Sequence, residues 1–406
     1  MKVSVTPKPL SGRIAAPPSK SMAHRYLIAA ALSDGKSHIR GISSSEDISA
    51  TIDCLRTLGA RVSLADGVAT VHGIDPRSAA PQGPLPCRES GSTLRFFLPL
   101  CLLSGNPAEL TGSRRLLERP LSVYEKIAKE HGLTLSRSEH SVTVGGRLPG
   151  GEYRVRGDIS SQFITGLLFA LPFTEGGGTI RLLPPVESRS YLELTVAALN
   201  RFGLGVRWLD ECTLAVPAVD RLTPADVSVE GDYSNAAFFE ALSALGHDVL
   251  VTGLSDDSRQ GDRIYREYYR ALLAGTPTLS LADCPDLGPI LMALAAALHG
   301  ARFVDTARLA IKESDRGAAM AEELRKFGAE VTLSENEITV VAAGLHRPAE
   351  PLSGHNDHRI VMASATLATL VGGEIDGAEA VKKSLPEYFS MLNQLGAEVT
   401  YHEADQ

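Results

Sequence analysis

Twelve glycines in two interleaved series limit how this sequence can fold more than any other feature. Each glycine of the first series follows an Ala- or Leu-rich run and precedes a β-branched or apolar run; the series is Gly35, Gly105, Gly177, Gly246, Gly300 and Gly372. Its members are 70, 72, 69, 54 and 72 residues apart. The second series ends amphipathic helical patterns and consists of Gly59, Gly132, Gly203, Gly275, Gly328 and Gly396. The chain therefore contains six copies of one pattern.

Each of these glycines is predicted to follow a helix, because glycine adopts a left-handed backbone at little cost and turns the chain into a strand. Each copy then holds two helices with strands between them, in roughly 70 residues, and is too short to bury its own core. Three copies make a domain of roughly 200 residues, so the 406 residues predict an α/β (α+β) fold with two similar domains and helices packed inside. The spacing of 54 indicates that one copy has lost a connecting segment. The alternative is helix–strand alternation without true repeats.

Composition argues against several classes of protein. Apolar residues make up 44% of the chain, and the longest apolar runs fall short of the ~20 residues that a membrane helix needs. The five cysteines show no CxxC or His–Cys spacing, which argues against structural zinc and a disulfide framework. They favour a reducing compartment, and the N-terminus lacks a signal-peptide pattern, so we expect a cytoplasmic protein. A net charge of −8 and a single tryptophan argue against nucleic-acid binding.

Short polar segments with cationic residues precede most of the predicted helices. Exposed N–H groups and the positive end of the helix dipole favour anions at such places. Lys and Arg there cost about 0.3–1 kcal/mol each, and a bound anion removes that cost. We therefore predict an anion site shared by the two halves, the alternative being that the cations are simply solvated. The cationic segments are residues 19–25, 89–95, 187–191, 312–316, 355–359 and 383–386, and residues 157–163 form a similar segment with neutral donors only.

Two carboxylates lie near these cations. Asp286 is at a proline-bounded helix start, and Glu313 lies between Lys312 and Arg316. Carboxylates among cations stay ionised at neutral pH and can accept and return a proton. Asp286 is alternatively a plain N-cap, and His358 is either a proton donor or a structural hydrogen-bonding group.

The motifs of several other chemistries do not occur. We find no GxxxxGK[ST] loop, no GxGxxG after a strand, no HExxH and no GxSxG. The sequence therefore favours a reaction of small, highly charged molecules that uses no metal and no cofactor.

Taken together and in order, these segments resemble those of the 5-enolpyruvylshikimate-3-phosphate (EPSP) synthases. The resemblance implies two domains, each of three βαβαββ-type units, with the active site in the cleft between them. It implies a first domain over residues 19–229, on the shikimate 3-phosphate side. The second domain, on the phosphoenolpyruvate side, then consists of residues 1–18 and 230–406. The matching motifs are Ser19-Lys20-Ser21-x-x-x-Arg25, Ser90-Gly91-Ser92-x-x-Arg95, Glu118-Arg119-Pro120, Ser160-Ser161-Gln162-Phe163, Ser188-Arg189-x-Tyr191, Glu230-x-Asp232, Pro285-Asp286, Lys312-Glu313-x-x-Arg316, Asn356-Asp357-His358-Arg359 and Lys383-x-x-Pro386.

The resemblance also implies a reaction in the shikimate pathway, which leads to chorismate and the aromatic amino acids. The carboxyvinyl group of phosphoenolpyruvate passes to the 5-hydroxyl of shikimate 3-phosphate and phosphate leaves, by addition and elimination through a tetrahedral intermediate. Both substrates carry a carboxylate and a phosphate, which Arg side chains bind in bidentate fashion.

The family pattern assigns residues to each task. Proton transfer is assigned to Asp286 and Glu313, with Lys20 and His358 close by, and the division of steps between the two carboxylates stays open. Shikimate 3-phosphate is assigned to Ser21, Arg25, Ser160, Ser161, Gln162, Ser188, Tyr191, Asp286 and Lys312. Phosphoenolpyruvate is assigned to Lys20, Gly91, Arg119, Gln162, Arg316, Arg359 and Lys383.

The sequence departs from the family pattern around the second helix-start segment. Glu89 replaces an Asn, Ser92 a Thr and Phe96 a Pro that many members have, and Arg308 stands where some have Asn. An acid at Glu89 repels the substrate phosphate unless Arg88, Arg95 or another cation pairs with it.

Two other functions compete with this interpretation. UDP-N-acetylglucosamine enolpyruvyl transferases share the fold, but their Lys-Asn pair is Lys20-Ser21 here, and no cysteine of the kind in their loop occurs between Cys101 and Cys212. A ring-like clamp around nucleic acid requires cations along helix faces rather than at helix starts. We expect a monomer that acts on two small substrates, without nucleic-acid or membrane partners.

Overall fold

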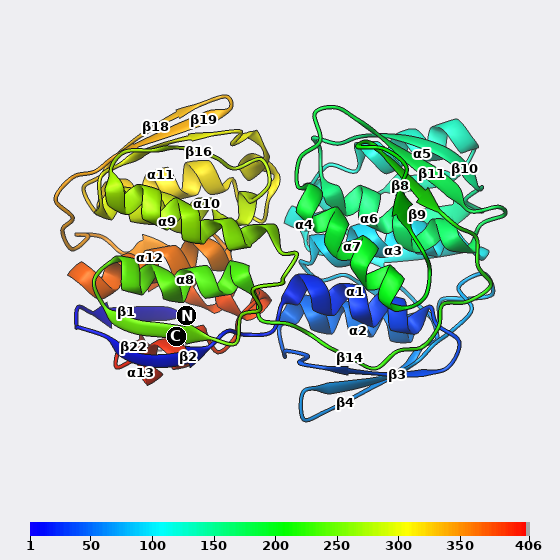
Figure 1. Cartoon of the computed structure of the whole chain (residues 1–406), viewed down its shortest axis with the longest axis horizontal. Helices are drawn as coiled ribbons and strands as arrows, with labels where there is room; N and C mark the ends of the chain where they lie inside the picture. Colours follow the sequence, from blue (N-terminus) through cyan, green and yellow to red (C-terminus); the bar gives the residue numbers. More distant parts are fainter. Residues whose placement is uncertain (403–406) are drawn as a thin grey trace. The chain divides into compact units, whose positions relative to one another are not determined.

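The computed structural model describes residues 1–402, which form two compact units (Figure 1). Unit 1 comprises Met1–Ser19 and the chain from Glu230 onward, and unit 2 comprises Lys20–Val229. Each unit has its own core of buried apolar side chains, and the predicted α/β fold class is confirmed. None of the helices in the described chain combines the length and apolar character needed to cross a bilayer.

Unit 2 contains three four-stranded sheets that share one pattern: a parallel pair at one side, followed by two antiparallel pairings. The first has the order β14 (Val227–Ser228), β3 (Lys36–Arg40), β5 (Val68–His72), β4 (Arg61–Ala65). The second has the order β6 (Leu85–Pro86), β7 (Gly105–Thr111), β9 (Ser141–Gly146), β8 (Thr134–Arg137). The third has the order β10 (Gly151–Arg156), β11 (Gly178–Leu183), β13 (Thr213–Val216), β12 (Arg207–Trp208).

The helices of unit 2 connect these strands. Helix α6 is apolar on all sides and almost wholly buried, whereas α5 is amphipathic, so α6 lies in the core and α5 at the surface. The helices are α1 (Lys20–Ala31), α2 (Glu46–Thr57), α3 (Gly91–Cys101), α4 (Arg114–Glu118), α5 (Ser122–His131), α6 (Ser161–Ala170), the 3₁₀ helix η1 (Leu171–Phe173) and α7 (Arg189–Arg201).

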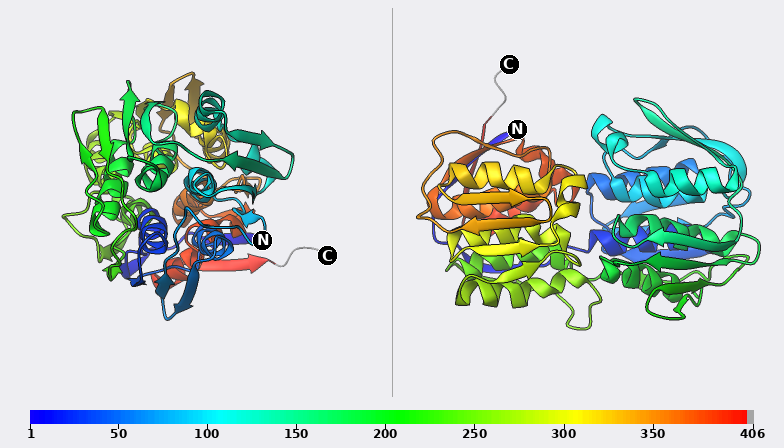
Figure 2. Two further views of the ribbon diagram at one scale, coloured as in Figure 1. Left: turned by 90° about the vertical axis from the view of Figure 1, so that its right-hand side faces the viewer. Right: turned by 90° about the horizontal axis from the view of Figure 1, so that it is seen from above.

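Unit 1 repeats this sheet pattern with one exception. One sheet has the order β16 (Thr278–Ser280), β17 (Ala301–Val304), β19 (Glu337–Val341), β18 (Glu330–Ser334), and these strands lie side by side in yellow and orange in the right view of Figure 2. Another has the order β20 (Leu352–Ser353), β21 (Gly373–Asp376), β1 (Lys2–Thr6), β22 (Glu398–His402). The exception is a parallel pair formed by β2 (Ser11–Ala15) and β15 (Asp248–Thr252).

The two-stranded sheet occurs where the glycine spacing is short. Helix α9 (Tyr265–Ala274) leads to β16 at Thr278 without the two further antiparallel strands that complete each other sheet. The spacing of 54 residues between Gly246 and Gly300 therefore corresponds to a missing hairpin.

The helices of unit 1 lie between its sheets (Figure 1). Helix α10 (Gly288–Ala297) is apolar on every side and its first nine residues are buried, while α9 is amphipathic. The other helices are α8 (Tyr233–Ala244), α11 (Arg316–Lys326), α12 (His358–Val371), α13 (Tyr388–Gln394) and the 3₁₀ helices η2 (Gly261–Ile264), η3 (Pro285–Leu287), η4 (Ala307–Ile311) and η5 (Ala378–Lys383).

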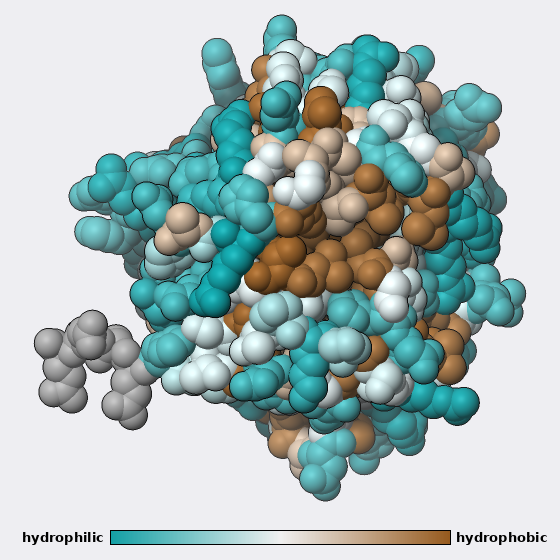
Figure 3. Space-filling model, turned by 90° about the vertical axis from the view of Figure 1, so that its left-hand side faces the viewer, coloured by the Kyte–Doolittle hydropathy of each residue, from teal (hydrophilic) through white to brown (hydrophobic). Residues whose placement is uncertain are grey.

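The core of unit 1 comes close to the surface at several helix ends. Leu245, Leu298 and Val371 follow or end α8, α10 and α12 and are only partly buried. Figure 3 shows that apolar side chains gather in the middle of one face of the molecule.

Eleven of the twelve series glycines have φ between 66° and 132°, as predicted for a chain reversal after a helix. Gly275, which lies between α9 and β16, differs: its φ is 164°, which is extended backbone.

Several helices begin earlier than the sequence pattern predicts. Helix α11 begins at Arg316 rather than Ala318, and α12 begins at His358 rather than Ile360. Helix α1 begins at Lys20, as an N-cap at Ser19 predicts. Asp315 and Asp357 accept hydrogen bonds from backbone N–H groups of α11 and α12, which makes the polar segments the first helical turn. Cationic residues of these segments therefore belong to the helices that they were expected to precede.

Alanine substitutions at Gly166 of α6 and at Gly246 should separate the cost of overpacking from the cost of backbone strain. A Cβ there would lie 2.2 Å from Tyr124 Oη and 2.4 Å from the Arg95 carbonyl oxygen. We expect Gly166→Ala to lower the free energy of unfolding by about 2–3 kcal/mol, because overpacking outweighs the better helix propensity of alanine. Gly246 has φ of 94° and open space around it, so Gly246→Ala should cost only about 1 kcal/mol. Urea unfolding of both variants checks this, and equal effects would contradict it.

Candidate active site

In unit 1, Arg316 is a fully buried cation surrounded by carboxylates. It is the first residue of α11, with its side chain 1% exposed. Its Nε lies 2.8 Å from Asp357 Oδ2, and its Nη1 lies 2.7 Å from Asp286 Oδ1. Its Nη2 donates to Glu313 Oε2 at 2.8 Å. Burial disfavours the charge, but these carboxylates outweigh it and raise the pKa of Arg316, so the cation is permanent.

Asp357 joins two helix N-termini. It is the N-cap of α12, and its Oδ1 accepts from the Arg359 backbone N–H at 3.0 Å. Burial acts against its charge, but Arg316 outweighs burial and holds the pKa of Asp357 below its usual range. The sequence analysis left Asp357 out of the candidate residues, although an aspartate directly before an apolar helix is the usual signal for an N-cap.

Asp286 lies among three cations. Besides Arg316, Arg359 Nη2 lies 3.2 Å from Asp286 Oδ2 and Lys312 Nζ lies 3.3 Å from Asp286 Oδ1. The carboxylate is 22% exposed, so it is within reach of a ligand. Partial burial lowers the pKa of Lys312 to about 8, although Asp286 opposes the shift.

We call these residues the unit 1 cluster: Asp286, Lys312, Glu313, Arg316, Asp357 and Arg359. His358 and Lys383 adjoin it. His358 is 1% exposed with its Nδ1 3.9 Å from Asp357 Oδ1, and Lys383 donates to the carbonyl of Asn356. The structure thus brings every predicted residue of unit 1 to one place.

Three of the candidate cations lie at the C-terminal ends of short helices. Lys312 follows the 3₁₀ helix η4, Lys383 ends η5, and Arg119 follows α4. The C-terminal end of a helix carries partial negative charge, so cations there are favourable and need no anion to offset them.

In unit 2, Lys20 is held by a carboxylate that the sequence analysis did not identify. Lys20 Nζ lies 2.6 Å from Asp47 Oδ2, and both side chains are partly buried. Asp47 is in the first turn of α2, where an acid is favoured by the helix dipole. The position of Asp47 near the start of a predicted helix was the one sequence signal that could have pointed to it.

A buried chain of hydrogen bonds connects the starts of α1 and α3. His24 Nδ1 lies 2.7 Å from Thr51 Oγ1, Thr51 bonds Thr93 at 2.8 Å, and Thr93 donates to the Ser90 hydroxyl at 2.8 Å. Burial, with help from Lys20 and Arg25, lowers the pKa of His24, so its ring is neutral. The chain fixes the turn that carries Gly91.

Arg25 is buried and bonds α1 to α7. Its Nε donates to Thr195 Oγ1, Nη1 to the carbonyl of Ser21, and Nη2 to the carbonyl of Tyr191, at 2.7–3.0 Å. Its guanidinium carbon lies 5.5 Å from the centre of the Phe96 ring. Burial lowers the pKa of Arg25 to about 10. Arg25 therefore positions two neighbouring predicted residues, and the unusual Phe96 packs beneath it.

Gly91 is the first residue of α3, and the Arg119 side chain lies over it. A Cβ on Gly91 would be 2.4 Å from Arg119 Nη1, so only glycine allows this approach. Arg119 is 6% exposed.

Glu89 departs from the family pattern, and the two arginines expected to pair with it bond other residues. Arg88 donates to Asp53 Oδ2 at 2.7 Å, and Arg95 donates to Gln162 Oε1 at 2.7 Å.

The remaining predicted residues of unit 2 lie at the starts of α6 and α7. Ser160 is the N-cap of α6, and Gln162 Nε2 donates to Ser92 Oγ at 3.0 Å. Ser161 is the first residue of α6. Ser188 precedes α7 with φ of 53° and is fully buried, which holds the turn before Tyr191.

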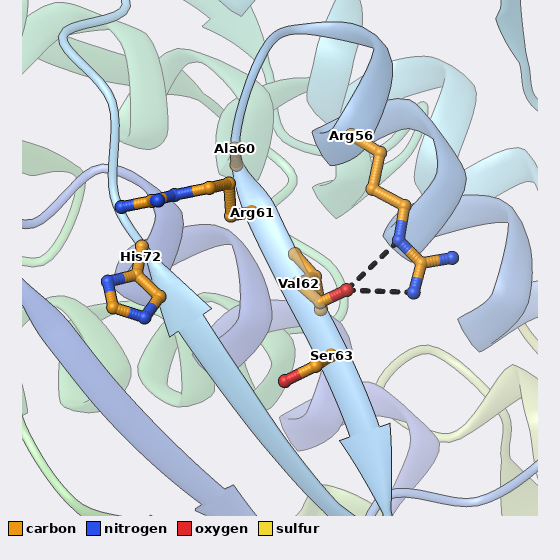
Figure 4. A pocket seen from close by; sticks show the side chains of 6 residues that line it. All are labelled: Arg56, Ala60, Arg61, Val62, Ser63 and His72. Atoms are coloured by element: carbon orange, nitrogen blue, oxygen red, sulfur yellow. Dashed lines mark hydrogen bonds between the residues drawn. The ribbon is translucent and has the colours of Figure 1, made fainter.

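The surface hollow that Figure 4 shows is separate from these residues. It has a volume of about 480 Å³ and is lined by Arg56, Ala60, Arg61, Val62, Ser63 and His72. Arg56 Nε and Nη2 donate to the Val62 carbonyl at 3.1 and 2.8 Å, so this cation joins α2 to β4.

Comparison with known proteins places the chain in a family. The model of the EPSP synthase (3-phosphoshikimate 1-carboxyvinyltransferase) family matches residues 5–392. The chain is 37% identical to the 3-phosphoshikimate 1-carboxyvinyltransferase of Clostridium kluyveri, over 98% of each chain. It is 35% identical to that of Clostridium novyi, over 97% of each. The chain belongs to the EPSP synthase family.

Solved structures agree with the fold of an EPSP synthase. An EPSP synthase from Acinetobacter baumannii has 23% identity and a TM-score of 0.76, covering 98% of this chain and 100% of that chain. The enolpyruvyl transferase NikO from Streptomyces tendae has 15% identity and a TM-score of 0.80. The predicted function is confirmed: this member of the EPSP synthase family is a transferase of the shikimate pathway that moves the carboxyvinyl group of phosphoenolpyruvate to shikimate 3-phosphate. The UDP-N-acetylglucosamine alternative is not favoured.

The contact between Gly91 and Arg119 predicts a selective loss of substrate binding. In Gly91→Ala the new methyl group displaces the Arg119 guanidinium, while the backbone stays unstrained because Gly91 has no positive φ. We expect the KM for phosphoenolpyruvate to rise at least 10-fold and the Tm to change by less than about 2 °C. The KM for shikimate 3-phosphate serves as the internal control and should change less than twofold. Equal changes in both constants would contradict the assignment.

Proposed function

We propose that the unit 1 cluster and the helix starts of unit 2 together bind the two substrates and run the transfer by addition and elimination. The observation that supports this most directly is Asp286, a partly exposed carboxylate held by Arg316, Arg359 and Lys312, with Glu313 on the same Arg316. Such an arrangement keeps the carboxylates ionised and next to cations that bind phosphate and carboxylate groups. The proposal requires both units to reach the same pair of substrates during turnover.

In the addition step, the 5-hydroxyl oxygen of shikimate 3-phosphate bonds to C2 of phosphoenolpyruvate. The hydroxyl proton passes to one carboxylate, and a proton is delivered to C3, which becomes a methyl group. In the elimination step, the methyl group loses a proton and the bond between C2 and the phosphate oxygen breaks. We assign these proton transfers to Asp286 and Glu313, with Lys20 and His358 close by.

Each substrate is assigned its own set of side chains. We propose that shikimate 3-phosphate is bound by Ser21, Arg25, Ser160, Ser161, Gln162, Ser188, Tyr191, Asp286 and Lys312. We propose that phosphoenolpyruvate is bound by Lys20, Gly91, Arg119, Gln162, Arg316, Arg359 and Lys383. Phosphate groups carry about −1.5 to −2 charges near pH 7, so bringing two such substrates together requires this density of positive charge. Because the protein already holds most of these cations in place, little side-chain entropy is lost on binding.

The enzyme is further proposed to act as a monomer in the cytoplasm. The free cysteines, of which Cys54, Cys87, Cys101 and Cys284 are buried, fit a reducing compartment.

Release of phosphate from phosphoenolpyruvate tests the function directly. We expect phosphate to appear only when shikimate 3-phosphate is also present, because addition must precede loss of phosphate. UDP-N-acetylglucosamine in its place should give no phosphate. Phosphate release without shikimate 3-phosphate would contradict the mechanism.

The same assay tests the proton-transfer residues. Glu313→Gln and Asp286→Asn keep the side-chain shape and should each lower kcat at least about 100-fold. Glu337→Gln is the matched control, since Glu337 pairs with Arg302 on the surface of β17 and β19 and should retain normal kcat.

The lowered pKa of Lys312 predicts how the affinity for shikimate 3-phosphate depends on pH. Its pKa of about 8 means that the free enzyme loses this positive charge as the pH rises past 8. The substrate phosphate is already fully ionised there, so affinity should fall about 5- to 10-fold between pH 7 and pH 9. Calorimetric Kd values measure this. Lys312→Met should bind more weakly at pH 7 and lose the pH dependence; a pH step that persists in Lys312→Met would refute the role of Lys312.

A further inference from the structure

Glu323 is a completely buried carboxylate outside the unit 1 cluster. It lies on α11 with its side chain 0% exposed. Its Oε1 is 2.7 Å from His355 Nε2, and its Oε2 accepts from the Ser353 backbone N–H at 3.0 Å. Lys326 Nζ lies 2.9 and 3.1 Å from the two oxygens. A charged group in the core needs partners of this kind, and Glu323 obtains two of them from the segment before α12.

That segment has an unusual backbone. His355 and Asn356 have φ of 47° and 51°, two consecutive left-handed residues that are not glycine. Such conformations cost of order 1 kcal/mol each and persist only where other contacts hold them. The contacts on one side are those of Glu323 with His355 and Ser353.

The segment also makes contacts with residues assigned to phosphoenolpyruvate. The carbonyl of Asn356 accepts from Lys383 Nζ. The next residue, Asp357, pairs with Arg316 and accepts the backbone N–H of Arg359. Three phosphoenolpyruvate-binding candidates thus depend on the conformation of residues 355–357.

Two glutamates and one histidine at this place resemble the ligands of a metal site. Glu322, Glu323 and His355 offer ligand atoms that lie within 4.8 Å of one another. Lys326 Nζ, however, bonds both oxygens of Glu323, so the chain itself supplies the positive charge at that place. The arrangement is that of a structural clamp.

We propose that Glu323 and His355 are positioning residues for phosphoenolpyruvate, holding residues 353–357 so that Lys383, Arg316 and Arg359 keep their binding geometry. We call this pair the Glu323–His355 clamp; its role rests on the proposed function of those three cations. The hydrogen bond that the His355 ring makes to the Glu323 carboxylate raises the pKa of His355. The charged form of the ring is therefore favoured, and a carboxylate binds that form most strongly.

Steady-state kinetics of His355→Ala test the clamp. We expect the KM for phosphoenolpyruvate to rise about 10-fold, while kcat and the KM for shikimate 3-phosphate change less than threefold. His355→Gln should restore the KM for phosphoenolpyruvate to within about threefold of the wild type, because the glutamine amide can donate to Glu323 from a similar distance. Glu323→Gln should raise the same KM, and urea unfolding shows whether this buried variant is still folded.

Glu322→Gln is the matched control, since Glu322 is the adjacent acid on α11, 57% exposed and 4.0 Å from His355. It should leave every constant within twofold. An unchanged KM for phosphoenolpyruvate in His355→Ala, or equal rises for both substrates, would overturn the clamp. No rescue by His355→Gln would do the same. A wild-type chain that releases no phosphate with both substrates present would instead refute the proposed reaction, so the two failures are distinguishable.

Discussion

The pairing of the buried Arg316 with three carboxylates is the interaction on which the rest of unit 1 depends. A guanidinium removed from water is stable only where its charge and its N–H groups are matched, and Asp286, Glu313 and Asp357 supply that match from three different segments. The pairing therefore fixes where η3, α11 and α12 begin relative to one another. It also leaves Asp286 partly exposed and shared with Lys312 and Arg359, which places an accessible carboxylate among cations.

Unit 2 positions its candidate residues by different means. Lys20 forms an ion pair with Asp47. Arg25 and Arg95, in contrast, donate to neutral hydroxyl, carbonyl and amide groups, and the chain from His24 to Ser90 is formed by neutral hydrogen bonds. Neutral hydrogen bonds of this kind fix geometry without adding charge. The two units thus contribute unlike environments: permanent charge pairs in unit 1, and mainly oriented donors with the Arg119 cation over Gly91 in unit 2.

The repeated sheet pattern explains why one chain can present so many helix starts. Each complete sheet adds two antiparallel strand pairings to a parallel pair, and helices cover the inner side of the sheets. In four of the six sheets the two parallel strands follow one another in the chain and are joined through a helix, so helix starts recur with the repeat and candidate residues recur with them. Losing the hairpin beside β15 removes strands but leaves α8 and α9 in place, so the repeat tolerates the deletion.

The sequence by itself determined the fold class and the repeated pattern, because glycine placement is a local property of the chain. Its helix-start chemistry indicated where anions could bind, and the resemblance to the family assigned the candidate residues to the two substrates. The sequence did not show that Lys312 and Lys383 lie at the ends of 3₁₀ helices, since 3₁₀ helices of five or six residues have no reliable periodic signal. It also missed Asp357, Asp47 and Glu323. Their partners are 27 to 41 residues away in the sequence. Asp47 pairs with Lys20, Asp357 pairs with Arg316, and Glu323 pairs with His355 in the segment before α12. Only the tertiary structure decided these pairings, because burial, which makes an unmatched charge so costly, exists only once the chain has folded.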